Sequence, residues 1–236
     1  MPNSNQDHIV TSYSDELTSL AQLIAEMGGQ VEVAIENGTK ALLKLDRELA
    51  DVTIIADQRI DDMQRRIDDV AVSMIARRQP MASDLRAIVT AIHVASDLER
   101  VGDMAKQLAR RSLKLDGLSL QPTFYNGVRN MTGLVLRQIK DALDAYASRD
   151  SAAAIEVCNR DDEVDAMHTS LFRELLTYMM EDPRNITQCT HLLFCAKNLE
   201  RIGDHATNIA ERAYYLQTGK QLSSDVQELH RTQIKA

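Results

Sequence analysis

The chain has 236 residues, 44% of them hydrophobic, and a formal net charge of −8. This charge argues against a nucleic-acid-binding surface, which needs a basic face, and favours cations or basic protein surfaces as partners. No apolar run approaches the length of a membrane-spanning helix, and residues 1–13 lack the apolar stretch of a secretory signal. We therefore expect a cytoplasmic protein, in which the unpaired thiols of Cys158, Cys189 and Cys195 have a structural role.

The distribution of proline, glycine and amphipathic segments predicts an all-α protein with six long helices. In chain order these helices cover residues 14–45, 47–77, 83–115, 123–149, 151–180 and 187–218. Ser14, Asp46 and Ser83 are the predicted N-caps of the first three helices. Gly28 and Gly29 weaken the first helix and are expected to kink it. Breaks between helices coincide with Pro80, Pro122 and Pro183, while Gly117 and Gly219 follow the third and sixth helices.

The chain contains an internal duplication. Residues Leu98–Ala105 read LERVGDMA, and residues Leu199–Ala206 read LERIGDHA, 101 positions later. Upstream, Asp57–Met63 aligns with Asp161–Met167 at an offset of 104. The sequence thus predicts two units of three helices each, residues 14–118 and 119–219, with flexible termini at 1–13 and 220–236.

Pairs of acidic residues recur in both units. Each repeated motif has a Glu and an Asp four positions apart, and the preceding helix of each unit again carries two Asp residues at this spacing. On a helix, such a spacing places both carboxylates on one face. The apolar stripe that leads into the first motif indicates that these acids interrupt a surface facing the core. Its members are Leu85, Ile88, Ile92 and Ala95.

Three segments together resemble the PhoU family of phosphate-signalling proteins. They are the pair of LERxGDxA motifs, the stretch RQPMASDLR at Arg78–Arg86, and HLLFCAKNLERIGDHATNIAE at His191–Glu211. The resemblance covers residues 14–219 and implies two tandem three-helix bundles related by a pseudo-twofold axis. It also implies a cytoplasmic negative regulator that links the ATPase subunit of a phosphate ABC transporter to a phosphate-sensing histidine kinase. We further expect a homodimer that binds no nucleic acid.

The resemblance implies two metal sites, because family members bind metal through acidic motifs on neighbouring helices. Carried over by position, the first site consists of Asp57, Asp61, Glu99 and Asp103. The second consists of Asp161, Asp165, Glu200 and Asp204. The first motif departs from the family pattern, since Met104 stands where the second has His205.

The chemistry of these residues agrees with a metal site. Four carboxylates with few nitrogen and no sulfur donors suit hard or borderline cations such as Fe, Mn, Mg or Zn. Gly102 and Gly203, inside the motifs, would let a metal, an anion or a facing helix approach the backbone closely. The alternative is a solvated acidic face, with Arg100 and Arg201 as local ion-pair partners.

We predict a protein that is not an enzyme. A metal-dependent hydrolase or oxidase that uses the paired carboxylates to activate water is the alternative. The chain has no Glu-x-x-His pair of the di-iron oxidases and no nucleotide-binding or nucleophile-elbow motif. The acids also lack a recognisable general base beside them. This favours a regulatory protein that links the transporter and the kinase over a metal-dependent enzyme.

Overall fold

A computed structural model describes residues 4–115, 123–223 and 226–227, in which no strand occurs. The helices are α1 (Ser4–Lys44), α2 (Arg47–Arg78), α3 (Ser83–Leu115), α4 (Thr123–Ser148), α5 (Ser151–Asn159), α6 (Asp161–Glu181) and α7 (Ile186–Thr218). A single 3-10 turn, Pro183–Asn185, joins α6 to α7. The all-α prediction is therefore confirmed. None of the described helices has the length and apolar character needed to cross a bilayer.

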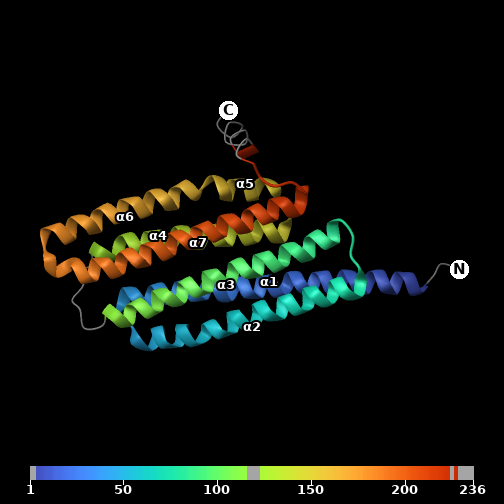
Figure 1. The fold of residues 1–236 in the computed structure, drawn as a ribbon, viewed down its shortest axis with the longest axis horizontal. Helices are drawn as coiled ribbons and strands as arrows, with labels where there is room; N and C mark the ends of the chain where they lie inside the picture. The colour runs from blue at the N-terminus through green and yellow to red at the C-terminus, as the bar shows by residue number, and fades with distance from the viewer. Residues whose placement is uncertain (1–3, 116–122, 224–225, 228–236) are drawn as a thin grey trace.

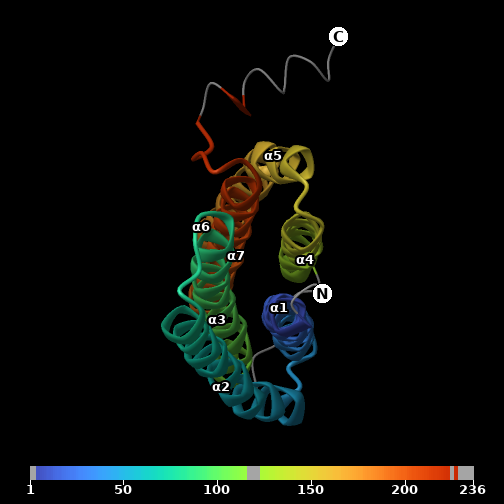
Figure 2. The same ribbon diagram turned by 90° about the vertical axis from the view of Figure 1, so that its right-hand side faces the viewer.

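The helices form two elongated bundles lying side by side (Figure 1). Helices α1, α2 and α3 pack together in one bundle, and α4 to α7 form the other, in which α5 and α6 together occupy the place of α2. The bundles meet where α3 packs against α7 and α1 packs against α4. Seen along the helices, these two pairs lie at the middle of the molecule (Figure 2). The predicted pair of three-helix bundles is confirmed.

Most predicted helix boundaries agree with the structure, and the first does not. Asp46 caps α2, since its Oδ1 accepts a hydrogen bond from Leu49 N at 3.0 Å. Gly219 ends α7 with a left-handed φ of 71°, a conformation that glycine adopts without strain. The prediction for Ser14 was wrong: α1 begins at Ser4 and runs through residue 14. Gly28 and Gly29 lie within this one helix.

The middle helix of the second bundle is broken, whereas one helix was predicted over residues 151–180. α5 ends at Asn159, and Arg160 adopts φ −92° and ψ 0° before α6 begins at Asp161. Two interactions favour this break. Arg160 Nη2 donates a hydrogen bond to Asp141 Oδ2 on α4 at 2.6 Å, and the first turn of α6 places three acidic residues at the positive end of the helix dipole.

One hydrophobic core extends through both bundles. Its fully buried members include Met27, Ile67 and Leu98 from the first and Ile139 and Leu199 from the second.

Several smaller predictions can be compared with this core. The three cysteines are buried and free, as expected, and burial raises the pKa of Cys195 to about 12. Leu85 was wrongly assigned to the core stripe and is 38% exposed. The predicted breaks at Gly117 and Pro122 lie outside the described residues.

Candidate functional site

The glycines of both repeated motifs lie where a neighbouring helix comes close. A Cβ at Gly102 on α3 would lie 3.0 Å from Ile60 Cδ1 on α2. A Cβ at Gly203 on α7 would lie 3.2 Å from Val164 Cγ1 on α6. Of the three reasons considered for these glycines, the structure supports the close approach of a facing helix.

The close approach brings the predicted acids together across each helix pair. Asp57 and Asp61 on α2 lie near Glu99 and Asp103 on α3, and we call these four the first cluster. Burial raises the pKa of Glu99, and the neighbouring Asp103 carboxylate raises it further. The pKa of Asp61 rises through burial and then through the charge of Asp57.

The second cluster repeats this arrangement with Asp161 and Asp165 on α6 and Glu200 and Asp204 on α7. Burial raises the pKa of Asp204, and the charges of Glu200 and Asp161 add to the effect. The pKa of Asp165 is raised by burial and by Asp161. In both clusters the carboxylates therefore repel one another in a partly desolvated environment.

A lysine already offsets this repulsion in the first cluster. Lys106, one turn after Asp103, donates hydrogen bonds from Nζ to Asp57 Oδ2 and, at 3.2 Å, to Asp103 Oδ1. The Asp57 side chain is only 4% exposed, and that of Lys106 is 19% exposed. The hydrogen bond with Asp57 raises the pKa of Lys106 and so favours its charged form.

The second cluster has neutral hydrogen-bond donors in place of the lysine. Thr207 stands 101 residues after Lys106 and donates from Oγ1 to Asp161 Oδ1 at 3.0 Å. Gln138 Nε2 on α4 donates to the same oxygen at 3.3 Å and to Thr207 Oγ1 at 3.1 Å. A cation, Lys197, does lie 2.6 Å from Glu200 Oε1, but the lysine side chain is 53% exposed to solvent.

The structure agrees only in part with the alternative of a solvated acidic face that is paired with local arginines. Arg100 Nε lies 3.6 Å from Glu99 Oε2, but its side chain is 61% exposed, so the attraction is weakened by solvent.

The histidine of the second motif is turned toward the other bundle. His205 Nδ1 lies 2.8 Å from Asp97 Oδ1 on α3, and Asn208 Nδ2 lies 3.4 Å from the same oxygen. At the equivalent place in the first motif, Met104 is buried in the core. The difference between the motifs thus concerns the contact between the bundles.

The donor chemistry fits a metal ion better in the second cluster than in the first. All four residues of each cluster carry carboxylates, the donors that hard cations prefer. Within the described residues, however, no three His, Cys, Asp or Glu side chains already converge closely enough to hold a metal. A cation would have to draw the carboxylates together, and in the first cluster it would also have to displace Lys106.

Sequence reasoning did not select Lys106, Gln138 or Thr207. The spacing of three between Asp103 and Lys106 is a local signal for an ion pair on a helix. Gln138 comes from another helix, α4, and its contact with Asp161 depends on the tertiary fold.

The fold and the repeated acidic motifs define a protein of two helical-bundle repeats. The family model of the PhoU domain matches this chain twice, over residues 24–112 and 128–213. The chain belongs to the PhoU family.

Its relatives are similar over most of their length. A protein of Rhizobium meliloti, named phosphate-specific transport system accessory protein PhoU homolog, is 52% identical over 91% of this chain and 90% of its own. A protein of the same name from Caulobacter vibrioides is 46% identical over 92% of this chain and 95% of its own.

Two crystal structures resemble the fold. PhoU from Pseudomonas aeruginosa superposes with a TM-score of 0.84, at 40% identity, over 88% of this chain and 100% of that chain. The phosphate transport system regulatory protein PhoU from Streptococcus pneumoniae gives a TM-score of 0.82, at 29% identity, over 89% of this chain and 99% of that chain.

Proposed function

We propose that this chain is a cytoplasmic negative regulator of phosphate uptake and of phosphate-starvation signalling. It acts as a non-enzymatic adaptor between the ATPase subunit of the phosphate transporter and a phosphate-sensing histidine kinase, as a homodimer. The observation that carries the proposal is the family membership over both repeats, since relatives are named as accessory or regulatory proteins of phosphate transport. The net charge of −8 supports contacts with basic surfaces of the partners.

We also propose that the second cluster binds a divalent or trivalent metal, with Fe, Mn, Mg and Zn as candidates. Asp161, Asp165, Glu200 and Asp204 repel one another, and neutral donors rather than a cation hold Asp161. A bound metal would stabilise the partly buried charges. The first cluster stays a predicted metal site, for which Lys106 is the competing cation.

The regulatory proposal is tested by deletion. Removing this protein should switch on phosphate-starvation genes in phosphate-rich medium, and a plasmid copy should restore repression. A reporter fused to a starvation promoter measures both effects. Normal repression in the deletion strain would contradict the regulatory role.

The enzyme alternative is tested on purified protein. Phosphoester turnover is assayed with each metal added, for the wild type and for Asp204→Asn. We expect no metal-dependent turnover, because no activated nucleophile has been identified beside the acids. Turnover that depends on metal and disappears in Asp204→Asn would favour the hydrolase in place of the adaptor.

A further inference from the structure

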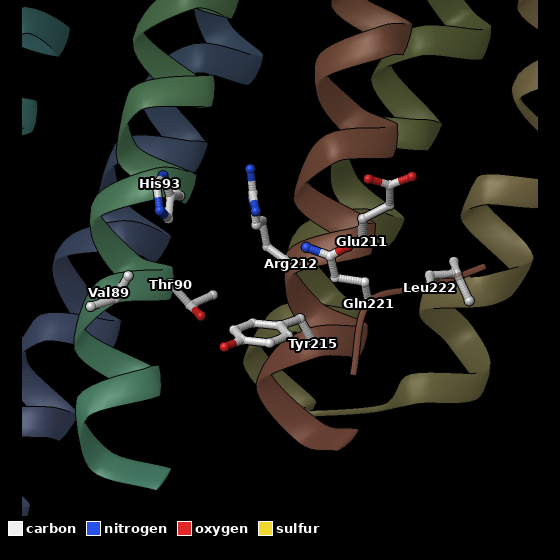
Figure 3. A pocket seen from close by; sticks show the side chains of 8 residues that line it. All are labelled: Val89, Thr90, His93, Glu211, Arg212, Tyr215, Gln221 and Leu222. Atoms are coloured by element: carbon white, nitrogen blue, oxygen red, sulfur yellow. The ribbon is translucent and has the colours of Figure 1, made fainter. Parts of the chain in front are cut away.

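A polar cavity lies on the contact between the two repeats, and none of the residues of the two acid clusters lines it. Its volume is about 470 Å³, within the range of small-molecule sites. The side chains that line it come from α3, from α7 and from the segment that follows α7 (Figure 3). They are Val89, Thr90, His93, Glu211, Arg212, Tyr215, Gln221 and Leu222.

Arg212 is the central cation of this cavity. Its side chain stands in the space between α3 and α7, with His93 facing it from α3, while Glu211 leaves α7 on the side away from α3 (Figure 3). The Nε atom of Arg212 is buried and has no hydrogen-bond partner among the described residues. A buried guanidinium nitrogen without a partner is costly, and a bound acceptor that reached it would offset this cost.

The internal duplication provides a comparison site within the same molecule. The offset of 101 relates Arg212 to Arg111, Thr90 to His191, and His93 to Phe194. These equivalents also meet across α3 and α7, at the opposite end of the helix pair.

At the comparison site the arginine is satisfied by protein groups. Arg111 Nη1 lies 3.1 Å from His191 Nδ1, and the guanidinium carbon lies 4.2 Å from the centroid of the Phe194 ring. Such stacking offsets part of the free energy that is lost when the guanidinium group leaves water. At the cavity, Thr90 and His93 replace these larger partners. Arg111 therefore contacts an aromatic ring and an imidazole, whereas Arg212, at the equivalent position of the other repeat, lines a cavity.

The two guanidinium groups and the hydrogen-bond donors at this cavity indicate an anionic ligand. Arg86, whose guanidinium carbon lies 5.6 Å from the centroid of the Tyr215 ring, adds a second cation beside the cavity. The only carboxylate in the lining is Glu211. Tyr215 and Gln221 contribute further donors, from a hydroxyl and an amide group. The lining thus holds one guanidinium group and one carboxylate, and Arg86 adds a positive charge beside it.

We propose that this cavity binds a small organic phosphate monoester. The phosphoryl group receives hydrogen bonds from Arg212 and His93, since donors that approach from two helices suit a tetrahedral group and guanidinium binds phosphate in a bidentate manner. The cavity is larger than a free phosphate ion needs, and the organic part packs on the Tyr215 ring. A ligand held in this way would join the two repeats.

Binding is measured by isothermal titration calorimetry on the full-length protein, with adenosine monophosphate as the probe. Adenosine, ribose 5-phosphate and inorganic phosphate are titrated in parallel. We expect adenosine monophosphate to bind most tightly and adenosine not to bind. Binding of adenosine with equal affinity, or of inorganic phosphate as tightly as of the monoester, would overturn the proposal.

Two variants locate the site. Arg212→Gln should weaken binding about tenfold to a hundredfold, because it removes a charged hydrogen-bond donor, and should leave the thermal midpoint almost unchanged. The matched control is Arg111→Gln, which should lower the thermal midpoint by removing the contact with Phe194 and should leave binding unchanged. Equal losses of binding in both variants would contradict the assignment.

A third variant tests whether an aromatic side chain at position 93 closes the cavity. His93→Phe recreates the aromatic partner that Arg111 has at the comparison site. We expect it to abolish binding and to raise the thermal midpoint, since Arg212 gains a ring to stack on. Unchanged binding in a folded His93→Phe protein would also overturn the proposal.

Discussion

The two acid clusters differ in the groups that hold their least exposed aspartates. Lys106 donates to Asp57 and Asp103 in the first cluster, whereas Thr207 and Gln138 hold Asp161 in the second. An ammonium group tethered to a helix stays at high effective concentration, so a free cation must compete with it. The duplicated clusters are therefore expected to differ in how strongly they need a metal.

Exchanging these two residues tests that expectation. We expect the wild-type protein to bind metal at the second cluster. The Lys106→Thr variant should bind metal at both clusters, because the competing ammonium group is removed. The Thr207→Lys variant should lose metal binding at the second cluster. Elemental analysis after reconstitution with Mn, Fe, Mg or Zn gives the stoichiometry. The control is Lys197→Thr, in which a surface lysine is removed and the number of sites should not change. Equal stoichiometry in all four proteins would rule out a role for Lys106 as competing cation.

The sequence predicted the acids of both clusters but not their counter-charges. The spacing of four placed each pair on one helix face, and the duplication showed that the pattern occurs twice. The contacts of Asp161 with Gln138, and of Asp97 with His205, join residues far apart in the chain. Such contacts depend on how the helices pack, for which a local pattern contains no signal.

At the scale of helices, the closest packing in the first bundle depends on Gly38 of α1. A Cβ at this position would lie 2.6 Å from the carbonyl oxygen of Ala105 on α3. Because a backbone atom cannot rotate away, any side chain here must push the two helices apart. Gly29, on the same helix, is exposed, and a Cβ added there would have no neighbouring atom within 4 Å.

Alanine substitutions at these two glycines should have opposite effects. Gly38→Ala should lower the free energy of unfolding by about 1–3 kcal/mol through overpacking. Gly29→Ala should raise it by about 0.5–1 kcal/mol, because alanine restricts the unfolded chain and fits the helix without strain. Urea denaturation followed by far-UV circular dichroism measures both changes. A Gly38→Ala protein as stable as the wild type would show that α1 and α3 are not in this close contact.

Helices α1 and α2 are also joined by an ion pair that depends on pH. Arg78 Nη2 lies 2.8 Å from Glu16 Oε1, and both side chains are 24% exposed. The hydrogen bond from Arg78 lowers the pKa of Glu16 below its usual value of 4.5. The pair therefore contributes its full stability above pH 4.5 and loses this contribution as the pH falls through the lowered pKa.

Replacing Glu16 tests the contribution of this pair. We expect Glu16→Gln to be less stable than the wild type by about 0.5–1 kcal/mol at about pH 7, a small value because solvent screens the charges. The difference should shrink in acid, where the wild-type carboxyl group is protonated. Urea midpoints of both proteins at a series of pH values measure this change, with Glu36→Gln, a substitution elsewhere on α1, as the control. A difference that stays constant down to the acid limit would contradict the assignment.

The helices themselves were largely predictable, because the signals for them are local. Asp46 and Gly219 mark helix ends through caps that need only neighbouring residues. The break at Arg160 was missed, since the ion pair with Asp141 that accompanies it comes from α4. The early start of α1 was missed because the polar residues after Ser4 show little amphipathic pattern.

At the scale of the molecule, the two repeats share one core and one polar contact. The hydrophobic core contains buried residues from every helix of both bundles. Between α3 and α7, Asp97 accepts hydrogen bonds from His205 and Asn208 of the other repeat. A repeat on its own would expose the apolar faces of α3 or α7 and of α1 or α4 to water. The two bundles should therefore unfold as one cooperative unit.

The distribution of tyrosines makes this cooperativity measurable. The chain has no tryptophan, and all its tyrosines except Tyr13 lie after residue 119, in the second repeat. Tyrosine fluorescence thus reports chiefly on the second repeat, whereas circular dichroism reports on all helices. Gly38→Ala disturbs only the contact between α1 and α3 in the first repeat. We expect it to lower the urea midpoint equally by both probes, because the second bundle cannot keep its buried surface once the first has unfolded. A shift seen by circular dichroism alone, with an unchanged fluorescence midpoint, would show that the second repeat is stable by itself.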